Sequence, residues 1–318
     1  MNPIYLNHLL VFVDMDTYRS IGKSVYLNEY FACSEERTTH DQASGMSWAG
    51  RYYYGKNTYF EFMTPKSTAW LPRDALAFSI ETKNGSVELS RHLQQKLDRQ
   101  ISLFKRSRRY KEQDVPWFWT TEISRKNDAR LVSWVMEYDS DFLQEWVQPP
   151  SLLSTGTEQN DITRCGVLAR YRSVIGDNFP KRLFRDISSV TVALPADEIE
   201  LFDKELRIYG YVATELTGPS DSPIRTRNDP TRMQPVVIEK TVRYQGPDLE
   251  IVVDQIFPNE SRMSAAGWSK NGGITAFTMA TKPVSVTTTH SFGPACNLTI
   301  HKAGMATWNF GASYNQDS

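Results

Sequence analysis

The chain has 318 residues, of which 40% are hydrophobic and 12% aromatic, which is enough for two compact domains or one large repeated domain. Charged residues make up 23% and nearly cancel to a formal net charge of -1, which argues against binding to nucleic acid by bulk electrostatics. No stretch approaches the ~20 apolar residues of a membrane helix, and no secretory signal is evident. Three widely spaced cysteines fit a reducing, cytoplasmic setting.

The first predicted unit spans residues 5–65 and begins with a continuous apolar run, which is typical of a buried strand. Apolar side chains at helical spacing follow, and a polar segment at 35–39 ends the helical part. A tight turn at 55–57 then joins two aromatic strands into a hairpin. The predicted elements are a strand at 5–13, a helix at 17–31, and strands at 46–54 and 58–63.

The same order recurs twice along the chain, once in residues 74–146 and again after residue 187. A weaker set of strands with no helix covers 273–310, so a fourth unit is incomplete. In the second and third copies, the predicted elements are strands at 75–81, 115–123, 130–138, 187–194, 236–244 and 248–256, with helices at 87–99 and from Asp197 to Tyr209.

This repeat predicts an α+β fold made of βαβββ modules, whose mixed β-sheets form cups with the helices outside. We expect an N-terminal domain over residues 1–150, with paired modules at 5–65 and 74–146. A linker with a helix would cover 151–186, and a C-terminal domain with one clear and one degenerate module would cover 187–318.

Each copy carries a glutamate inside the apolar sequence of its last strand, namely Glu61, Glu137 and Glu250. An ionised carboxylate among core residues is costly unless it faces a cavity, a metal or a partner. Strand alternation places each glutamate on the face opposite its immediate neighbours. The recurrence therefore marks these carboxylates, together with His8 on the first strand, as candidate ligands or acid–base groups.

Two motifs in residues 5–65 resemble the vicinal oxygen chelate superfamily, which includes glyoxalase I, bleomycin-resistance proteins and extradiol dioxygenases. They are Asn7-His8-Leu9 on the first strand and Phe60-Glu61-Phe62-Met63-Thr64-Pro65 on the last. Residues 5–65 also resemble a group of uncharacterised glyoxalase-like proteins. The resemblance is weaker over 74–146 and 187–256, and poor beyond residue 260.

The resemblance implies a divalent metal, held by a histidine on the first strand and a glutamate on the last strand of each module. In this chain the implied ligands are His8, Glu61 and Glu137, and the two glutamates are also the implied catalytic groups. Three ligands with open positions suit Zn, Fe, Mn or Ni. However, no second histidine stands near Ala75–Ala77, so a lost metal site fits the sequence equally well.

Aromatic residues on the predicted strands form either ordinary core or the wall of a flat apolar pocket. Alternation places Trp117 and Trp119 on one face, and Tyr52 and Tyr54 on one face. The candidate substrate pocket consists of Trp48, Tyr52, Tyr54, Trp117, Trp119 and Trp134.

Two functions of different classes remain open. The first is an intracellular enzyme with lyase, isomerase or ring-opening chemistry on an aromatic or oxygen-rich metabolite, using a metal as a Lewis acid. The second is a metal-free protein that sequesters such a compound, or a metal-free cyclase or isomerase that uses the same pocket. We expect a small-molecule ligand, no nucleic-acid or membrane partner and no nucleotide cofactor, since no phosphate-binding glycine loop is present. A homodimer is compatible with the sequence.

Overall fold

Two βαβββ modules form the N-terminal half of the structure, a computed structural model that describes residues 2–41, 45–64, 73–110, 112–145, 163–176, 179–216, 238–256, 272–293 and 296–310. The first module consists of β1 (Ile4–Phe12), α1 (Met15–Lys23), a π-helical turn η1 (Tyr26–Phe31), β2 (Cys33–Asp41), β3 (Met46–Tyr54) and β4 (Tyr59–Met63). The second consists of β5 (Asp74–Ile80), α2 (Gly85–Lys96), β6 (Ile101–Tyr110), β7 (Gln113–Ile123) and β8 (Leu131–Tyr138). The predicted α+β class with repeated modules is confirmed.

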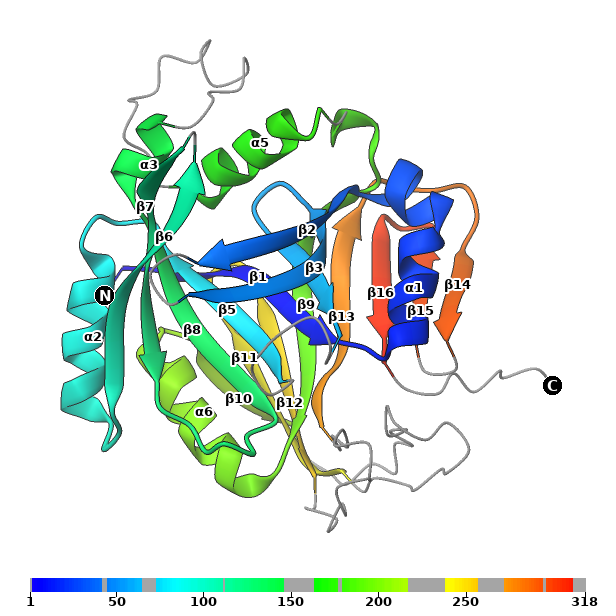
Figure 1. Cartoon of the computed structure of the whole chain (residues 1–318). Helices are drawn as coiled ribbons and strands as arrows, with labels where there is room; N and C mark the ends of the chain where they lie inside the picture. The colour runs from blue at the N-terminus through cyan, green and yellow to red at the C-terminus, as the bar shows by residue number, and fades with distance from the viewer. Residues whose placement is uncertain are drawn as a thin grey trace.

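The two modules close into one barrel with the strand order β1-β4-β3-β2-β6-β7-β8-β5 (Figure 1). Strand β1 runs parallel to β4 and antiparallel to β5, so the first strands of the modules lie side by side. On the opposite side, β2 meets β6 through the single pair Asp41↔Arg108. The ion pair between Asp41 and Arg106 reinforces this seam. The two modules therefore form a closed barrel with an interior where the sequence predicted a cup.

The strands at this seam, β2 and β6, are among the elements that the sequence pattern did not predict. Residues 35–39 were expected to be a polar end of the helical unit, but they lie within β2. Most of the residues in β2 are only partly buried or exposed, as are the described side chains of β6. A strand without a buried face lacks the alternation of apolar and polar residues that identifies strands in a sequence.

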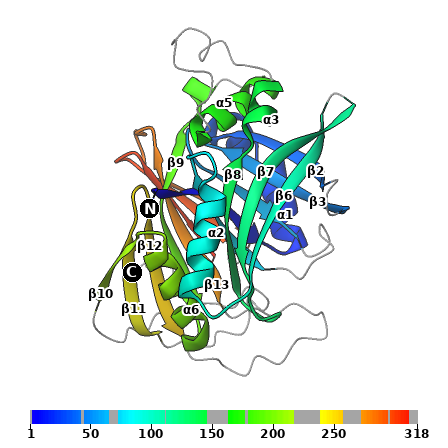
Figure 2. The same ribbon diagram turned by 90° about the vertical axis from the view of Figure 1, so that its left-hand side faces the viewer.

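A second, open sheet is formed by the C-terminal half, in the order β10-β11-β12-β9-β13-β16-β15-β14. Its helix, α6 (Ala196–Ile208), packs against β10 and β12, while α2 packs against β6, β7 and β8 of the barrel (Figure 2). The described part of residues 272–310 contains four strands and no helix. The strands are β9 (Phe184–Leu194), β10 (Val212–Leu216), β11 (Ile238–Gln245), β12 (Glu250–Ile256), β13 (Gly273–Thr281), β14 (Thr288–Gly293), β15 (Cys296–His301) and β16 (Met305–Asn309).

The outer face of the barrel packs on the second sheet, and one hydrophobic core joins them. Phe60 and Phe62 of β4 contact the Trp308 ring of β16, with centroids 6.3 Å and 5.2 Å away. Asp74 fastens the two sheets at one point, because its carboxylate accepts hydrogen bonds from the backbone N–H groups of Phe12 and Ile274. The domain boundaries inferred from the sequence stay a prediction, since the shared core does not set them.

Short helices connect the two halves: α3 (Ser140–Glu145), α5 (Arg164–Val174) and the 3₁₀ turn η2 (Phe179–Lys181). The helix predicted within the linker at 151–186 is thus present as α5. Residues 151–162, at the start of that predicted linker, lie outside the described residues. Among the helices that the structure describes, none is long and apolar enough to cross a membrane.

Candidate functional site

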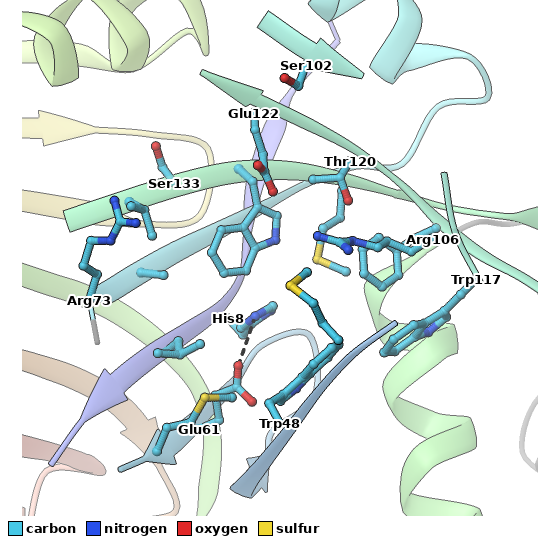
Figure 3. Close-up of a pocket in the computed structure, with 18 of the residues that line it drawn as sticks. His8, Trp48, Glu61, Arg73, Ser102, Arg106, Trp117, Thr120, Glu122 and Ser133 are labelled. Carbon is cyan, nitrogen blue, oxygen red and sulfur yellow. Dashed lines mark ion pairs between the residues drawn. The ribbon is translucent and has the colours of Figure 1, made fainter. Parts of the chain in front are cut away.

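A cavity of about 500 Å³ occupies the interior of the barrel (Figure 3). Its walls come from inward-facing side chains of both modules, chiefly on β1, β3, β4, β7 and β8. This volume is in the range of pockets that enclose a small molecule. The lining is largely aromatic or apolar, and a few ionisable groups point into it.

His8 and Glu61 meet inside this cavity, as the sequence predicts for a pair on the first and last strands of one module. His8 Nε2 lies 3.5 Å from Glu61 Oε1, and both side chains are almost completely buried. The His8 ring stacks on Tyr59, with ring centroids 4.3 Å apart, and its edge contacts Trp134. Glu61 Oε2 is buried and accepts no hydrogen bond from the described residues.

Burial shifts the pKa values of these two groups in opposite directions. It raises the pKa of Glu61 to about 7, although the positive charge of Arg37 and the Tyr52 hydroxyl act against the rise. Burial lowers the pKa of His8 to about 3. At neutral pH the imidazole is therefore neutral and the carboxyl is close to its midpoint, which is where a group both gives and takes a proton readily.

Asn7 fixes the orientation of the His8 ring. His8 Nδ1 lies 2.9 Å from Asn7 Oδ1, so this oxygen accepts a hydrogen bond from the Nδ1–H tautomer. Nε2 then carries a lone pair directed at Glu61. Asn7 also contacts the hydroxyl of Tyr138, which belongs to the second module. A register shift of β1 between Leu6 and His8 allows Asn7 and His8, adjacent in sequence, to serve the same site.

Glu137 does not point into the cavity with His8 and Glu61. This position corrects the prediction that Glu137 is a metal ligand and a catalytic group. Met136 and Tyr138 line the cavity, so alternation along β8 turns Glu137 to the outside of the barrel. There its two carboxylate oxygens accept hydrogen bonds from the backbone N–H groups of Asn84 and Ser86, 2.7 Å and 2.8 Å away. Glu137 therefore stabilises the N-terminus of α2.

Glu250, the third glutamate of the repeat, lies on the open sheet. Its carboxylate pairs with Arg243 on the neighbouring strand, 2.7 Å away, and both side chains are partly exposed. The recurrence of glutamate in the three last strands thus does not reflect a shared role.

Five of the six predicted aromatic residues line the cavity: Trp48, Tyr52, Tyr54, Trp117 and Trp134. Trp119 does not, because the register of β7 against β6 shifts between Arg106 and Ser107. This bulge lies beside Trp117 and breaks the alternation on which the prediction depended. Trp119 instead packs under the ammonium group of Lys105, 5.4 Å from the ring centroid. The role of the other five as a substrate pocket stays a prediction.

Charged residues that the sequence did not single out also line the cavity, namely Arg37, Arg73, Arg106, Glu122 and Arg125. Arg37 comes from the polar segment expected to end the helical unit, and its guanidinium lies 4.4 Å from the centre of the Tyr52 ring. Arg106 belongs to the basic stretch 105–109, and it lines the pocket and pairs with the buried Asp41. Correct assignment of β2 and β6 as strands would have revealed both.

The residues of the cavity do not fit a resident catalytic metal. Such an ion normally takes three protein ligands, and His8 and Glu61 supply two. Over the described parts of the chain, no cluster of three His, Cys, Asp or Glu side chains is placed to hold an ion. The second module places Ala75 of β5 and Met136 of β8 in the cavity wall, and its carboxylate in the lining, Glu122 of β7, does not form such a cluster with His8 and Glu61.

Comparison with protein families places the chain in a group without an assigned activity. A model described as a family of unknown function, DUF5829, matches residues 6–241. The chain belongs to this family. A search of the curated proteins finds no match.

Several solved structures are similar to the chain over most of its length, at low identity. A xylose isomerase-like TIM barrel/4-hydroxyphenylpyruvate dioxygenase fusion protein is 12% identical, with a TM-score of 0.38, and the match covers 85% of this chain and 35% of that one. A mutant 4-hydroxymandelate synthase from Streptomyces coelicolor is 8% identical, with a TM-score of 0.43, covering 86% and 70%. A 2,2',3-trihydroxybiphenyl 1,2-dioxygenase from Sphingomonas wittichii is 9% identical, with a TM-score of 0.34, covering 82% and 94%. These likenesses are too distant to assign a chemistry.

Proposed function

We propose that the protein is an enzyme that moves a proton on a small aromatic or oxygen-rich molecule bound inside the barrel, without a resident metal. Glu61 is the acid–base group of this reaction and His8 is its partner. The observation that carries the proposal is the buried Glu61–His8 pair, in which one carboxylate oxygen accepts no hydrogen bond from the described residues and both residues line an aromatic cavity.

The reaction begins with the carboxylate form of Glu61, which removes a proton from a carbon next to a carbonyl group of the bound molecule. The electron pair of the broken C–H bond moves into the carbonyl group and forms an enolate. Glu61, now protonated, returns the proton to another atom in an isomerase, or a leaving group departs from the neighbouring carbon in a lyase. A pKa of about 7 suits both directions of this transfer.

Neighbouring residues support these steps. Neutral His8 accepts a hydrogen bond from protonated Glu61 through Nε2, while Asn7 holds the other ring nitrogen. The Arg37 guanidinium, which acts electrostatically on Glu61, supplies the positive charge that stabilises the developing enolate. The aromatic walls exclude water from the reacting carbon and bind the flat part of the substrate.

Proton exchange in D₂O tests the proposal without knowledge of the product. The protein is incubated with a panel of aromatic keto and hydroxy acids, and loss of C–H signal is followed by ¹H NMR. We expect exchange by the wild type, at least about 100-fold slower exchange by Glu61→Gln, and no effect of EDTA. Exchange that EDTA abolishes, or that Glu61→Gln retains, would contradict the proposal. Glu137→Gln is the matched control, because its carboxylate faces outward to α2.

A second function is favoured by the second module, which places Ala75 and Met136 in the cavity wall where a second His–Glu pair would be expected. On this alternative the barrel sequesters an aromatic compound, and the wall aromatics provide the affinity. Calorimetry separates the two: ligands of the panel that bind but never exchange a proton would favour sequestration over catalysis.

A further inference from the structure

Two guanidinium groups line one end of the barrel cavity. Arg73 lies just before β5 and Arg125 just after β7. In Figure 3, Arg73 and Ser133 are drawn on one side of the His8–Glu61 pair, and Arg106 and Trp117 on the other. Burial lowers the pKa of Arg73, and the positive charge of Arg125 lowers it further, so the two cations repel each other.

Arg125 is held in place by the second half of the chain. Its side chain is 7% exposed, and its Nη2 donates to Glu205 of α6 and to the hydroxyl of Ser133. Glu205 is completely buried and also accepts hydrogen bonds from Ser133 and Tyr209. These contacts thus hold Arg125 at the cavity wall, and the Glu205 carboxylate balances its positive charge.

Arg73 has no such partner. Its guanidinium makes one long hydrogen bond, 3.4 Å from Nη1 to the carbonyl oxygen of Lys126, and forms no ion pair with the described residues. Glu198 and Asp128 attract it without contact. A cation beside a second cation, in a cavity wall and without a carboxylate, is the arrangement that an anion stabilises.

The other polar groups named at this end of the cavity are two uncharged side chains and one carboxyl. Ser124 and Asn127 line the cavity and are exposed, which places this end at an opening to solvent. Glu122 also lines the cavity, and burial raises the pKa of its carboxyl, although the positive charge of Arg106 acts against the rise. Burial therefore disfavours the charged form of Glu122, which is the form that would oppose an anion.

We propose that the ligand of the barrel carries a carboxylate or phosphate group, and that Arg73 and Arg125 bind this group at the open end of the cavity. The inference rests on the proposed function in placing the ligand in the barrel, with its aromatic part between the binding end and Glu61. The second half of the chain contributes to specificity by positioning Arg125 through Glu205.

Calorimetry with four probes of equal ring structure tests the proposal: phenylacetate, benzyl phosphate, phenylacetamide and 2-phenylethylamine. We expect the two anions to bind at least about 10-fold more tightly than the amide, and the amine most weakly. Arg73→Gln should remove the preference for anions and leave amide binding unchanged, while Arg73→Lys should retain part of it. Arg91→Gln on the outside of α2 is the matched control.

Comparison of phenylacetate with benzyl phosphate shows whether the anionic group of the ligand is a carboxylate or a phosphate. Tighter binding of phenylacetate identifies a carboxylate, and tighter binding of benzyl phosphate identifies a phosphate ester. Equal binding of anion and amide, a preference that persists in Arg73→Gln, or binding of no probe would overturn the proposal.

A ligand-free measurement provides a second test. Because burial is the largest effect on the Arg73 guanidinium and opposes its charge, Arg73→Gln should raise the Tm of the free protein, and Arg91→Gln should not. A lower Tm would make Arg73 a structural residue and contradict the proposal. Glu61→Gln should lose proton exchange and keep the anion preference, so exchange that persists in this variant while the preference is intact would refute only the proposed function.

Discussion

Carboxylates that are fully or partly buried occur in two regions of this protein, and they differ in what they contact. In the barrel cavity, Glu61 keeps an oxygen without a hydrogen-bond partner among the described residues, and burial raises the pKa of both Glu61 and Glu122. At the junction between the barrel and the C-terminal half, Glu205 and Asp186 accept several hydrogen bonds each. The same chemical group therefore keeps an oxygen without a donor in one region and is well supplied with donors in the other.

Because buried carboxylates of both kinds occur here, burial alone does not identify a carboxylate that has a functional role. A carboxylate that accepts two or more hydrogen bonds is already satisfied, and removing it leaves its donors unpaired. A carboxylate buried without donors costs free energy in the folded state, and a protein tolerates this cost where the group is used. Substitutions in the two regions should thus change stability in opposite directions.

The largest effect is expected at Glu205. Glu205→Ala leaves the Arg125 guanidinium uncompensated and should reduce the free energy of unfolding by about 3–5 kcal/mol, measured by urea denaturation. Glu200→Ala on the same helix is the control. Its carboxylate is exposed and pairs with Lys204, so we expect little change in stability. Equal losses in both variants would remove the distinction between the two regions.

At Glu61 the sign is reversed and depends on pH. Its pKa rises from 4.5 in the unfolded chain to about 7 in the folded one, so the folded protein binds more protons between these values. Relative to Glu61→Gln, the wild type should lose about 3 kcal/mol of stability as the pH rises from about 4.5 to 7. Urea denaturation across this range gives the difference directly.

A constant difference between wild type and Glu61→Gln over that range would show that Glu61 is not desolvated. The groups that act on Glu61 in the fold are His8, Arg37 and Tyr52. Burial lowers the pKa of His8 to about 3, so this residue reduces stability as the pH falls below about 6.5. The wild type and Glu61→Gln share this effect of His8, so the difference between their stabilities reports on Glu61 alone.

Asp186 of β9 should show a smaller loss than Glu205. Its carboxylate accepts hydrogen bonds from the backbone N–H groups of Asn57 and Thr58 and from both of their side chains. Asp186→Ala should cost about 2–3 kcal/mol, because these donors lose their acceptor at the turn before β4. The exposed Asp98 is a suitable control for thermal unfolding, and its replacement by Ala should have little effect.

The smallest expected effect is at Asn7, which positions the His8 ring. Asn7→Ala removes the acceptor of the Nδ1–H group, worth about 1 kcal/mol, and should slow proton exchange about fivefold while leaving ligand affinity unchanged. ¹⁵N NMR of the imidazole should show a mixture of tautomers. A single unchanged tautomer in this variant would mean that Asn7 does not orient the ring.

The order of many elements was readable from the sequence, because it depends on local pattern. Apolar runs and helical spacing identified β1, α1, β3, β4 and β5, and the hairpin turn fixed the pairing of β3 with β4. Alternation along β3 placed Tyr52 and Tyr54 on one face. The joint site of His8 and Glu61 was implied by the resemblance of residues 5–65, and the parallel pairing of β1 with β4 brings the two side chains together.

The rest was decided by contacts between segments far apart in the chain. Closure of the barrel at the seam of β2 and β6 brought Arg37 and Arg106 inside, although their strands have a weak apolar pattern. The bulge beside Trp117 moved Trp119 out, and the approach of α2 to β8 gave Glu137 its backbone donors. Arg125 reaches its partner Glu205 across 80 residues. A sequence pattern gives the face of a side chain, whereas only the packed structure decides what lies opposite that face.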